Sequence, residues 1–546
     1  MAPSLPLSGL PAICLSHHQR QQRHLQSLLP PSVQPPALHL ATVKSYLDSI
    51  PDQLHKFVFL QQLHIINPDT FYMLLIEHTD DVMPIVYTPT VGLACQRWSE
   101  IYFHPQGLYV PITAAGHVQQ LVDDWPNSQV DAVVFTDGGR ILGLGDLAAN
   151  GMGIPIGKLA LYVAFAGINP SRVLPVVLDL GTNNQELLQS KNYIGLRQRR
   201  SETNQNQYDE FVGEFLSSIV NRFGRRTLLQ FEDFATEDAL RLLKLYRHKY
   251  MTFNDDVQGT AAMTLAGILS ALPMLKHKLH EQTIVFFGAG SSGIGIAEII
   301  AQAMAESGEI KYEDARKRIW AVDSRGLIVS NRPKGGLADF KLPFAHDHEP
   351  IDSLTDIIDV IKPSILIGVS SQGGAFSSAI LQKLASINEH PVVFALSNPT
   401  SKSECSASDA FEQTNGRVLF ASGSPFDSVE YNSKVFHPRQ ANNVYVFPGI
   451  GLGALVSGAS EISDEMLLAA SKALASMVTD EDRAQGSLYP ALNMIRSITA
   501  LIAVAVAEKA FASGLATVPK PVSLHDTVAE AMSYDPTLSM TAQSKL

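Results

Sequence analysis

The stretch of residues 283–304 constrains the fold more than any other part of the chain. A run typical of a buried strand, Thr283-Ile284-Val285-Phe286-Phe287, continues directly into Gly288-Ala289-Gly290-Ser291-Ser292-Gly293, and an apolar helix pattern follows to about Met304. The order strand, G-x-G-x-x-G and helix is typical of a dinucleotide-binding unit, in which Gly288, Gly290 and Gly293 let a pyrophosphate reach the helix N-terminus. We therefore expect a parallel sheet that is covered by helices and binds a dinucleotide.

The next predicted strand leaves the identity of that dinucleotide open. The run Arg318-Ile319-Trp320-Ala321-Val322 ends at Asp323, where an acid binds the adenine ribose hydroxyls in such folds. Arg325 stands two positions further on, where a cation can accept a 2′-phosphate. Asp323 favours NAD and Arg325 favours NADP, so the sequence permits either cofactor.

Two pairs of adjacent acids indicate a metal site upstream of this unit. Glu232-Asp233 closes the apolar run of residues 227–231, and Asp255-Asp256 stands just before an apolar helix pattern at residues 261–272. Adjacent like charges repel, so they persist most easily beside a cation, a lysine or a helix N-terminus. Three of these four carboxylates, together with water molecules, would supply oxygen ligands, which suit Mg²⁺ or Mn²⁺ better than zinc. The alternative is that each pair caps a helix or lies in a solvated turn.

Lys158 and Tyr87 are candidates for proton transfer. Strand and helix patterns alternate over residues 130–180, which predicts a second parallel sheet, and Lys158 lies on the first turn of an apolar helix within it. The segment is not a phosphate-binding P-loop, because Met152 and Leu159 occupy its required positions. Lys158 is therefore either a surface lysine or a functional one. Tyr87 follows a short apolar run, where we expect a strand to end and a loop to begin. It is therefore either an aromatic residue of the core or a proton donor.

The composition excludes several classes of protein. With 546 residues and a net charge of -12, the chain lacks the basic face of a nucleic-acid binder, and we expect its one basic cluster, residues 197–200, to be a solvated loop. Cys14, Cys95 and Cys405 are too far apart in sequence for a zinc or disulfide motif, which fits a reducing compartment. No apolar run approaches the length of a membrane span, so we expect a soluble protein that does not bind membranes.

The compartment has two readings. The expected location is cytoplasmic. The alternative is peroxisomal in a eukaryotic host, because the last three residues, Ser544-Lys545-Leu546, match a peroxisomal address, although so short a motif also arises by chance.

The expected fold class is α/β, in four parts. We expect an N-terminal arm and helical domain at residues 1–105 and a substrate and metal-binding α/β domain at residues 106–255, which residues 443–515 rejoin. A Rossmann-type NAD(P)-binding domain is expected at residues 256–442, with a C-terminal tail at residues 516–546.

From about Leu28 to about Gly514 the chain resembles malic enzyme, the malate dehydrogenase that also decarboxylates its substrate. The matching segments are Pro84-Ile85-Val86-Tyr87-Thr88-Pro89-Thr90-Val91-Gly92, residues 136–158, Gln230-Phe231-Glu232-Asp233-Phe234, residues 253–260, Leu396-Ser397-Asn398-Pro399-Thr400 and Asn442-Asn443-Val444-Tyr445-Val446-Phe447-Pro448-Gly449. These six motifs occur in the same order as in the family and are spread over most of the length of the chain, so the resemblance is specific.

The resemblance implies a role for each candidate residue. Tyr87 would be the general acid, Lys158 the general base and Asp255 the partner of Lys158. The implied metal ligands are Glu232, Asp233 and Asp256. Arg140, Asn398 and Asn443 would hold the carboxylates of the substrate, and Asn398 would also contact the cofactor. Ala441 stands where a glycine is common, which leaves open whether Asn442 or Asn443 faces the substrate.

The implied reaction is the oxidative decarboxylation of L-malate to pyruvate and CO₂ with NAD or NADP and Mg²⁺ or Mn²⁺. The alternative is malolactic chemistry, in which the cofactor stays bound and L-lactate leaves. A catalytically silent sensor is a third hypothesis, against which the competent residue at every catalytic position argues. The resemblance also implies a homodimer or homotetramer. Thr42 and Ile66 stand where animal relatives bind fumarate through arginines, so a fumarate site of that type is not expected.

Overall fold

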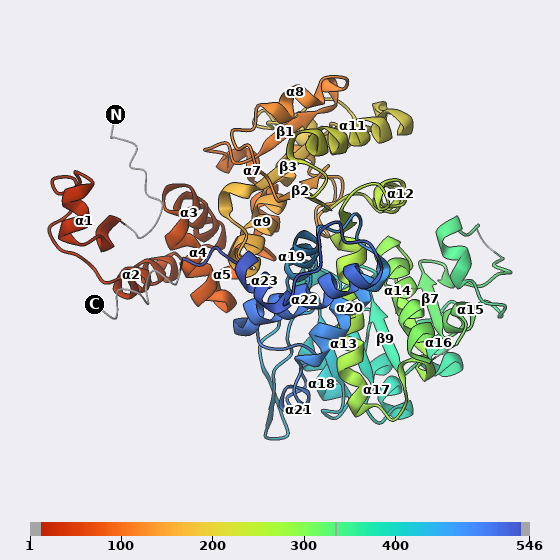
Figure 1. The fold of residues 1–546 in the computed structure, drawn as a ribbon. Helices are drawn as coiled ribbons and strands as arrows, with labels where there is room; N and C mark the ends of the chain where they lie inside the picture. The colour runs from red at the N-terminus through yellow and green to blue at the C-terminus, as the bar shows by residue number, and fades with distance from the viewer. Residues whose placement is uncertain (1–11, 309, 334–335, 537–546) are drawn as a thin grey trace.

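The computed structural model describes residues 12–308, 310–333 and 336–536 (Figure 1). The tripeptide Ser544-Lys545-Leu546, on which the alternative peroxisomal location depends, lies outside the described residues. Figure 1 shows small helices on one side, a first sheet with its own helices above, a second sheet below, and the C-terminal helices between them.

The N-terminal region is helical, as expected. Its main helices are α2 (Pro36–Ser49), α3 (Gln53–Ile66), α4 (Pro68–Glu77), α5 (Thr79–Val86) and α6 (Thr90–Gln96). Side chains cap two of them, because Asp52 accepts the backbone N–H of His55 at 2.9 Å and Asn67 accepts that of Thr70 at 3.2 Å.

The strand expected before Tyr87 is wrong. The run that precedes Tyr87 belongs to helix α5, and Tyr87 is its C-cap, whose backbone N–H donates to Met83 at 2.8 Å. Asp80 and Asp81 in the first turn favour a helix start here, which a short apolar run cannot reveal.

The first sheet contains five parallel strands in the order β1-β3-β2-β4-β5. They are β1 (Leu108–Pro111), β2 (Ala132–Thr136), β3 (Val173–Asp179), β4 (Leu228–Phe231) and β5 (Thr252–Asn254). Helix α9 (Gly153–Ala166) packs on one face and α11 (Gln205–Phe223) on the other, because alternate residues of each buried strand point to opposite faces. Both predicted acidic pairs follow carboxyl ends of strands of this sheet.

The second sheet is the expected Rossmann-type sheet, in the order β11-β10-β9-β6-β7-β8. Its strands are β6 (Ile284–Phe287), β7 (Ile319–Asp323), β8 (Gly326–Leu327), β9 (Ile365–Gly368), β10 (Val392–Ala395) and β11 (Leu419–Ser422), all parallel except β8. Helices α13 (Thr260–Ala271) and α14 (Ser291–Gly308) cover one face, and α16 (Leu354–Ile361), α17 (Ser378–Ile387) and α18 (Ala407–Gln413) cover the other. The predicted α/β class is therefore confirmed.

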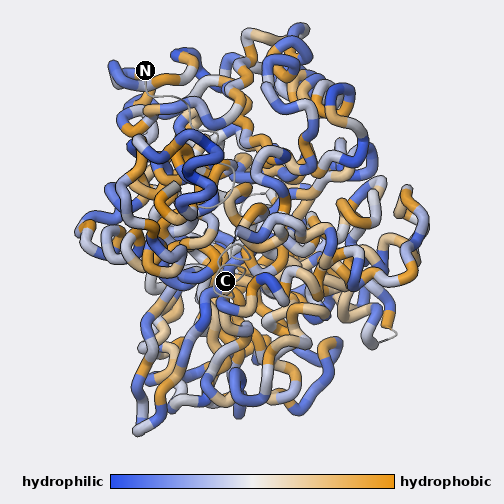
Figure 2. Tube along the Cα trace, turned by 60° about the vertical axis from the view of Figure 1, so that its left-hand side comes forward, coloured by the Kyte–Doolittle hydropathy of each residue, from blue (hydrophilic) through white to orange (hydrophobic). Residues whose placement is uncertain are grey.

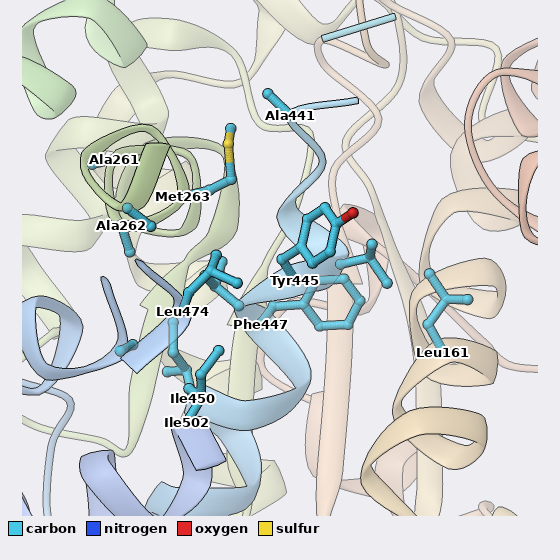
Figure 3. Packing of buried hydrophobic residues seen from close by; sticks show 14 of the residues in the cluster. Leu161, Ala261, Ala262, Met263, Ala441, Tyr445, Phe447, Ile450, Leu474 and Ile502 are labelled. Atoms are coloured by element: carbon cyan, nitrogen blue, oxygen red, sulfur yellow. The ribbon is translucent and has the colours of Figure 1, made fainter. Parts of the chain in front are cut away.

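The C-terminal helices join the two sheets through one large core. Helices α19 (Phe447–Ser457), α20 (Asp464–Ser476) and α22 (Ile495–Ala512) pack together and against α13. In Figure 3, Tyr445, Phe447 and Ile450 meet side chains from α9, α13 and α22. Figure 2 shows more apolar residues toward the middle of the molecule and more hydrophilic ones along its outer loops. The four-part division of the chain stays a prediction.

Smaller elements complete the description. They are α1 (His17–Gln22), α7 (Trp98–Ile101), α8 (Val118–Asp123), α10 (Gln185–Gln189), α12 (Thr236–Tyr246), α15 (Tyr312–Arg316), α21 (Asp480–Ala484), α23 (Leu524–Ala531), β12 (Val429–Tyr431) and β13 (Lys434–Phe436). One described helical stretch, Asp255–Met274, is long and apolar enough to cross a membrane, but 72% of it is buried inside the protein, as in a core helix.

The basic cluster at residues 197–200 is only partly solvated. Arg197 and Arg199 are exposed, as expected. Arg200 is not: its guanidinium pairs with the fully buried carboxylate of Asp137, which also accepts the Tyr208 hydroxyl at 2.7 Å. The expectation of a solvated loop is therefore wrong for Arg200, because a buried acid far away in the sequence attracts it.

Candidate active site

Lys158 is a buried lysine in the centre of the molecule. It is 1% exposed, because every residue of α9 is buried, and its Nζ hydrogen-bonds the Asp255 carboxylate and lies 3.1 Å from Glu232 Oε1. Burial alone would lower the pKa of Lys158, but Asp255 and Glu232 raise that pKa well above its ordinary value. The alternative of a surface lysine is wrong for this position.

Tyr87 stands beside the same acids. Its hydroxyl donates to Glu232 Oε1 at 3.3 Å, and the Lys158 Nζ lies 4.9 Å from the centre of its ring. Burial raises the pKa of Tyr87 well above its ordinary value, so the phenol keeps its proton. Gly157 permits this approach, because a Cβ there would lie 2.9 Å from the Val86 carbonyl oxygen and 3.2 Å from the Tyr87 ring.

The carboxylates of Glu232, Asp233 and Asp256 belong to two turns of the chain, one after β4 and one after β5. A backbone N–H of the first turn donates to a carboxylate of the second. The strand ends at Phe231, and Asp233 adopts a φ of 56°, which breaks the alternation that would otherwise send Glu232 and Asp233 to opposite faces. The Asp233 backbone N–H then donates to Asp256 Oδ2 at 2.7 Å. The two acidic pairs therefore lie next to each other in the structure, and their role as one site stays a prediction.

These carboxylates fit a divalent cation chemically. In the described part of the chain, no group of three or more histidine, cysteine or carboxyl side chains is arranged so that it could hold a metal ion. However, Asp233 Oδ2 is buried without a hydrogen-bond partner. Burial and the neighbouring acids raise the pKa of Glu232 and of Asp233 well above their usual values and that of Asp256 to about 6. Mutually repelling, buried oxygen donors of this kind are those that a hard cation binds.

A single π-helical turn, η6 (Asp255–Gly259), places Asp255 and Asp256. Two reciprocal contacts hold it: the Asn254 side chain accepts the Val257 N–H at 3.0 Å, and the Gln258 side chain accepts the Asn254 N–H at 3.0 Å. Only glycine fits at residue 259, because a Cβ there would collide with Asp255 Oδ1. Turns of this type occur mostly at functional sites.

The two candidate asparagines face different partners. Asn443 Nδ2 lies 3.1 Å from Asp255 Oδ2 and 3.0 Å from Thr260 Oγ1. Asn442 instead donates to Thr88 Oγ1 at 3.3 Å and caps the Val444 N–H at 3.0 Å. Asn443 is therefore the asparagine that lies beside Asp255, the carboxylate that pairs with Lys158. The sequence had left open which of the two asparagines faces the substrate.

A cavity of about 180 Å³ joins this cluster to the second sheet. Arg140, Asp233 and Asp256 line it from the first sheet, and Ser292, Ser371 and Asn398 line it from the second. The backbone fixes Arg140 there, since its N–H donates to the Asp233 carbonyl at 3.1 Å. A larger hollow of about 570 Å³, beside Asp131 and Arg226, contains none of the predicted residues. The smaller cavity is thus the one that the candidates Arg140, Asp233, Asp256 and Asn398 share, while Tyr87, Lys158, Glu232, Asp255 and Asn443 do not line it.

The glycines of the G-x-G-x-x-G segment have three different roles. Gly288 has a φ of 120°, and a Cβ there would lie 2.6 Å from the Val369 carbonyl carbon. A Cβ on Gly293 would collide with the Gly288 carbonyl oxygen. No described atom lies within 4 Å of the place where a Cβ on Gly290 would stand, which leaves space for a pyrophosphate above the start of α14. The segment therefore fits a bound dinucleotide.

Asp323 is surrounded by basic groups that no sequence motif had indicated. Arg332 donates to its two oxygens at 3.0 and 2.6 Å, and Lys341 Nζ donates to Oδ2 at 2.9 Å. Burial would raise the pKa of Asp323, but these cations hold that pKa well below its usual range. Arg325 is exposed and contributes its backbone N–H at 2.9 Å. Arg332 and Lys341 lie 9 and 18 residues after Asp323, and no local pattern marks them.

The fold and the site together define an oxidoreductase that uses a nicotinamide dinucleotide. Two family models match the chain: "Malic enzyme, N-terminal domain" over residues 66–247 and "Malic enzyme, NAD binding domain" over residues 257–511. The chain belongs to the malic enzyme family, and the resemblance seen in the sequence is confirmed.

Similar proteins include several from plants. The chain is 47% identical over 525 residues to an NADP-dependent malic enzyme of Vitis vinifera, covering 96% of this chain and 88% of that protein. It is 46% identical to a chloroplastic NADP-dependent malic enzyme of Zea mays, with 96% and 82% covered. The solved structure of the Entamoeba histolytica malic enzyme has the same fold, with a TM-score of 0.60, 24% identity, and 99% of this chain and 95% of that chain covered.

Proposed function

We propose that the protein oxidises and decarboxylates L-malate to pyruvate and CO₂, with reduction of NADP and with a bound Mg²⁺ or Mn²⁺. The observation that carries this proposal is the buried contact of Lys158, Asp255, Glu232 and Tyr87. Asp233 and Asp256, their neighbours in the sequence, line the cavity between the two sheets. The names of the plant relatives, at 46 to 47% identity, support the same reaction.

The proposed metal ligands are Glu232, Asp233 and Asp256. When bound, a divalent cation supplies a Lewis acid next to the C2 oxygen of malate, and the nicotinamide supplies the hydride acceptor. Arg140, Asn398 and Asn443 hold the two carboxylates of malate, in our proposal. Arg140 and Asn398 line the cavity, and Asn443 adjoins it through Thr260, whose hydroxyl accepts the Asn443 amide at 3.0 Å.

Lys158 acts as the general base toward the C2 hydroxyl. In the structure it is held as an ammonium by Asp255 and Glu232. When the charge of the neighbouring acids is neutralised, the pKa of Lys158 falls, so that the ammonium releases a proton to solvent. The neutral amine can then accept the proton of the C2 hydroxyl. Asp255 and Asn443 fix the position of its Nζ during this step.

Tyr87 acts as the general acid after CO₂ leaves. Its buried phenol remains protonated, and it contacts the same Glu232 oxygen as Lys158. From there it delivers a proton to C3 of the three-carbon product. The ring of Phe447, 4.3 Å from Lys158 Nζ, helps to exclude water around both groups.

We infer a preference for NADP over NAD. Arg332 and Lys341 already bind the carboxylate of Asp323, so this acid is a poor acceptor for ribose hydroxyls, whereas the two cations suit a 2′-phosphate. Relatives that are named NADP-dependent support this inference.

The assembly and the compartment are further proposals. We infer a homodimer or homotetramer, as the family resemblance implies. The exposed apolar side chains Tyr46, Ile66 and Phe103 of the N-terminal region are available for contacts between subunits. Relatives from Arabidopsis thaliana and rice are named chloroplastic, and other relatives carry no compartment in their names. The cytoplasmic and peroxisomal readings stay predictions.

One assay tests the proposed reaction. Purified protein is mixed with L-malate, Mn²⁺ and either NADP or NAD, and reduced cofactor and pyruvate are measured together. Equal amounts of both products, formed faster with NADP, are expected. Lactate without reduced cofactor would identify malolactic chemistry instead, and no turnover with either cofactor would overturn the proposal.

A further inference from the structure

Glu404 is a completely buried carboxylate beneath the edge of the second sheet. It is 0% exposed and lies just after the 3-10 turn η10 (Thr400–Lys402), next to the ends of β9 and β10. It forms no ion pair with any described residue. Its acceptor capacity is met by two serines, Ser370 after β9 and Ser397 after β10.

Four hydrogen bonds reach Glu404 from these serines. Ser370 donates its N–H and its hydroxyl to Oε1, both at 3.0 Å. Ser397 donates its hydroxyl to Oε1 at 2.6 Å and its N–H to Oε2 at 3.4 Å. One carboxylate therefore holds the first residues of two loops that follow neighbouring strands.

The hydroxyl protons can only point toward Glu404. Ser370 Oγ accepts the Gln372 N–H at 3.1 Å, and Ser397 Oγ accepts the Ser371 N–H at 2.8 Å. A serine hydroxyl that accepts an N–H still has one proton to donate, and here that proton goes to the carboxylate. A continuous series of hydrogen bonds runs from Ser371 through Ser397 and Glu404 to Ser370. These bonds hold the loops after β9 and β10 together.

The backbone around Glu404 is shaped to admit its side chain. A Cβ on Gly368, the last residue of β9, would lie 2.5 Å from Glu404 Cδ, so a larger residue would expel the carboxylate. The loops that it joins carry Ser371, Ser397 and Asn398, which line the 180 Å³ cavity opposite Arg140 and Asp256. Glu404 lines no part of that cavity itself.

We propose that Glu404 is a positioning residue for the nicotinamide end of the cofactor. Through Ser370 and Ser397 it fixes the two loops that form the dinucleotide side of the cavity, including Asn398. This inference rests on the proposed function, since it assigns the cavity to the cofactor and malate. A buried carboxylate with four donors gives a rigid anchor, and an amide in its place would turn an N–H₂ group toward those donors.

The test measures cofactor binding without malate. NADPH is titrated by its fluorescence into wild-type protein and into Glu404→Gln, Ser397→Ala and the double variant. We expect each single change to weaken binding about tenfold and the double variant to be no weaker than the single ones by more than about twofold, because both act through one contact. The KM for NADP should rise more than kcat falls.

Glu412→Gln is the matched control. Glu412 lies on α18 of the same domain, is exposed, and accepts the Ser408 hydroxyl at 2.7 Å, so its substitution removes the same charge and should leave NADPH binding unchanged. If Glu404→Gln does not fold, Ser370→Ala, Ser397→Ala and their double variant measure the same coupling.

Two results overturn the inference. The first is wild-type affinity in Glu404→Gln, and the second is additive losses in the double variant. If wild-type protein oxidises malate while Glu404→Gln binds NADPH normally, only the role of Glu404 falls. If wild-type protein neither binds NADPH nor oxidises malate, the proposed function falls with it.

Discussion

Tyr87 and Lys158 contact the same oxygen of Glu232, at 3.3 and 3.1 Å, from elements that lie far apart in the sequence. A buried phenol and a buried amine beside one acid form a pair that can exchange protons with a substrate on either side of it. The pair therefore allows the two proton transfers of the proposed reaction to be separated experimentally.

Tyr87→Phe should slow the protonation of C3 that follows loss of CO₂ more than it slows hydride transfer. The ring is kept and only the hydroxyl is lost, so we expect kcat for pyruvate formation from malate to fall by about 10²- to 10⁴-fold. Reduction of oxaloacetate by NADPH should remain within about tenfold of wild type, because it does not use the phenol proton. Stopped-flow absorbance measures both. Equal loss of both activities would contradict a proton-donor role for Tyr87.

Lys341→Ala should change the preference for the cofactor. Loss of its ammonium from the side of Asp323 should reduce kcat/KM for NADP by about tenfold or more and leave that for NAD within about twofold, because only NADP carries the 2′-phosphate. Initial rates at saturating malate give both values. Arg325→Ala removes an exposed arginine two residues from Asp323 and is the control. A larger effect of Arg325→Ala would restore the sequence-based expectation.

At this scale the sequence predicted the acids and Lys158 but not their supporting contacts. Glu232, Asp233, Asp255 and Asp256 are visible because adjacent acids are costly, and Lys158 because its flanks are apolar. Arg332, Lys341 and Glu404 are single polar residues in ordinary surroundings. Each of them hydrogen-bonds a partner that lies up to 34 residues away in the sequence. No sequence motif with a fixed spacing predicts such contacts.

Among the elements, the π-helical turn η6 depends most on one residue. Gly259→Ala would place a methyl group against Asp255 Oδ1, so Asp255 or the turn must move. We expect kcat/KM for malate to fall by about 10²-fold, the usual cost of misplacing a catalytic group by about 1 Å. Steady-state kinetics with Mn²⁺ measures this loss.

Gly336→Ala is the control for this substitution. Gly336 is exposed, and no described atom lies within 4 Å of a Cβ built there, so the same methyl group should cost nothing. Unchanged kinetics in Gly259→Ala would mean that the position of Asp255 is not fixed by the turn.

The elements differ in how well the sequence revealed them. Strand β3 lies within the region of residues 130–180 where alternating strands and helices were predicted, because a run of buried β-branched residues between turns is distinctive. Strands β1 and β5 were missed, because each has four or fewer residues and its register is set by a neighbouring strand. Tyr87 was placed after a strand for the same reason, since a short run shows no period.

For the whole molecule, we expect the buried acids to make stability depend on pH and on a divalent cation. The pKa of Asp256 rises from 3.8 to about 6 on folding, so the folded chain binds the proton more tightly. The contribution of Asp256 to the free energy of unfolding therefore falls as the pH rises from about 4 to 6, and it stays low above pH 6. A cation that binds only the folded chain should restore it, by about 2.7 kcal/mol at 100 times its Kd.

Thermal melts at pH 5 and pH 7.5 with and without Mn²⁺ measure this effect. The gain in Tm should be large at pH 7.5 and smaller at pH 5, where protons compete for the carboxylates. Asp256→Asn removes the titrating group and should reduce both the pH dependence and the gain from Mn²⁺. An equal gain in the variant and in wild type would place the cation elsewhere.

The arrangement of two parallel sheets could be predicted from the sequence, since strand and helix patterns alternate in both regions. The way in which helices α19, α20 and α22 fill the space between the sheets could not. Their residues are apolar on most sides, as Phe447 and Ile450 illustrate, and apolar composition alone does not say which elements a helix contacts.

Asn443 lies 188 residues after the acid that it contacts, and Tyr87 lies 145 residues before Glu232. During synthesis on a ribosome, the lysine, the acids and the phenol all emerge before the asparagine that completes their surroundings. A nascent chain that has folded only its first sheet therefore carries the proton-transfer groups without that asparagine and without the dinucleotide-binding sheet. If these groups act as proposed, turnover can begin only after most of the polypeptide has been made.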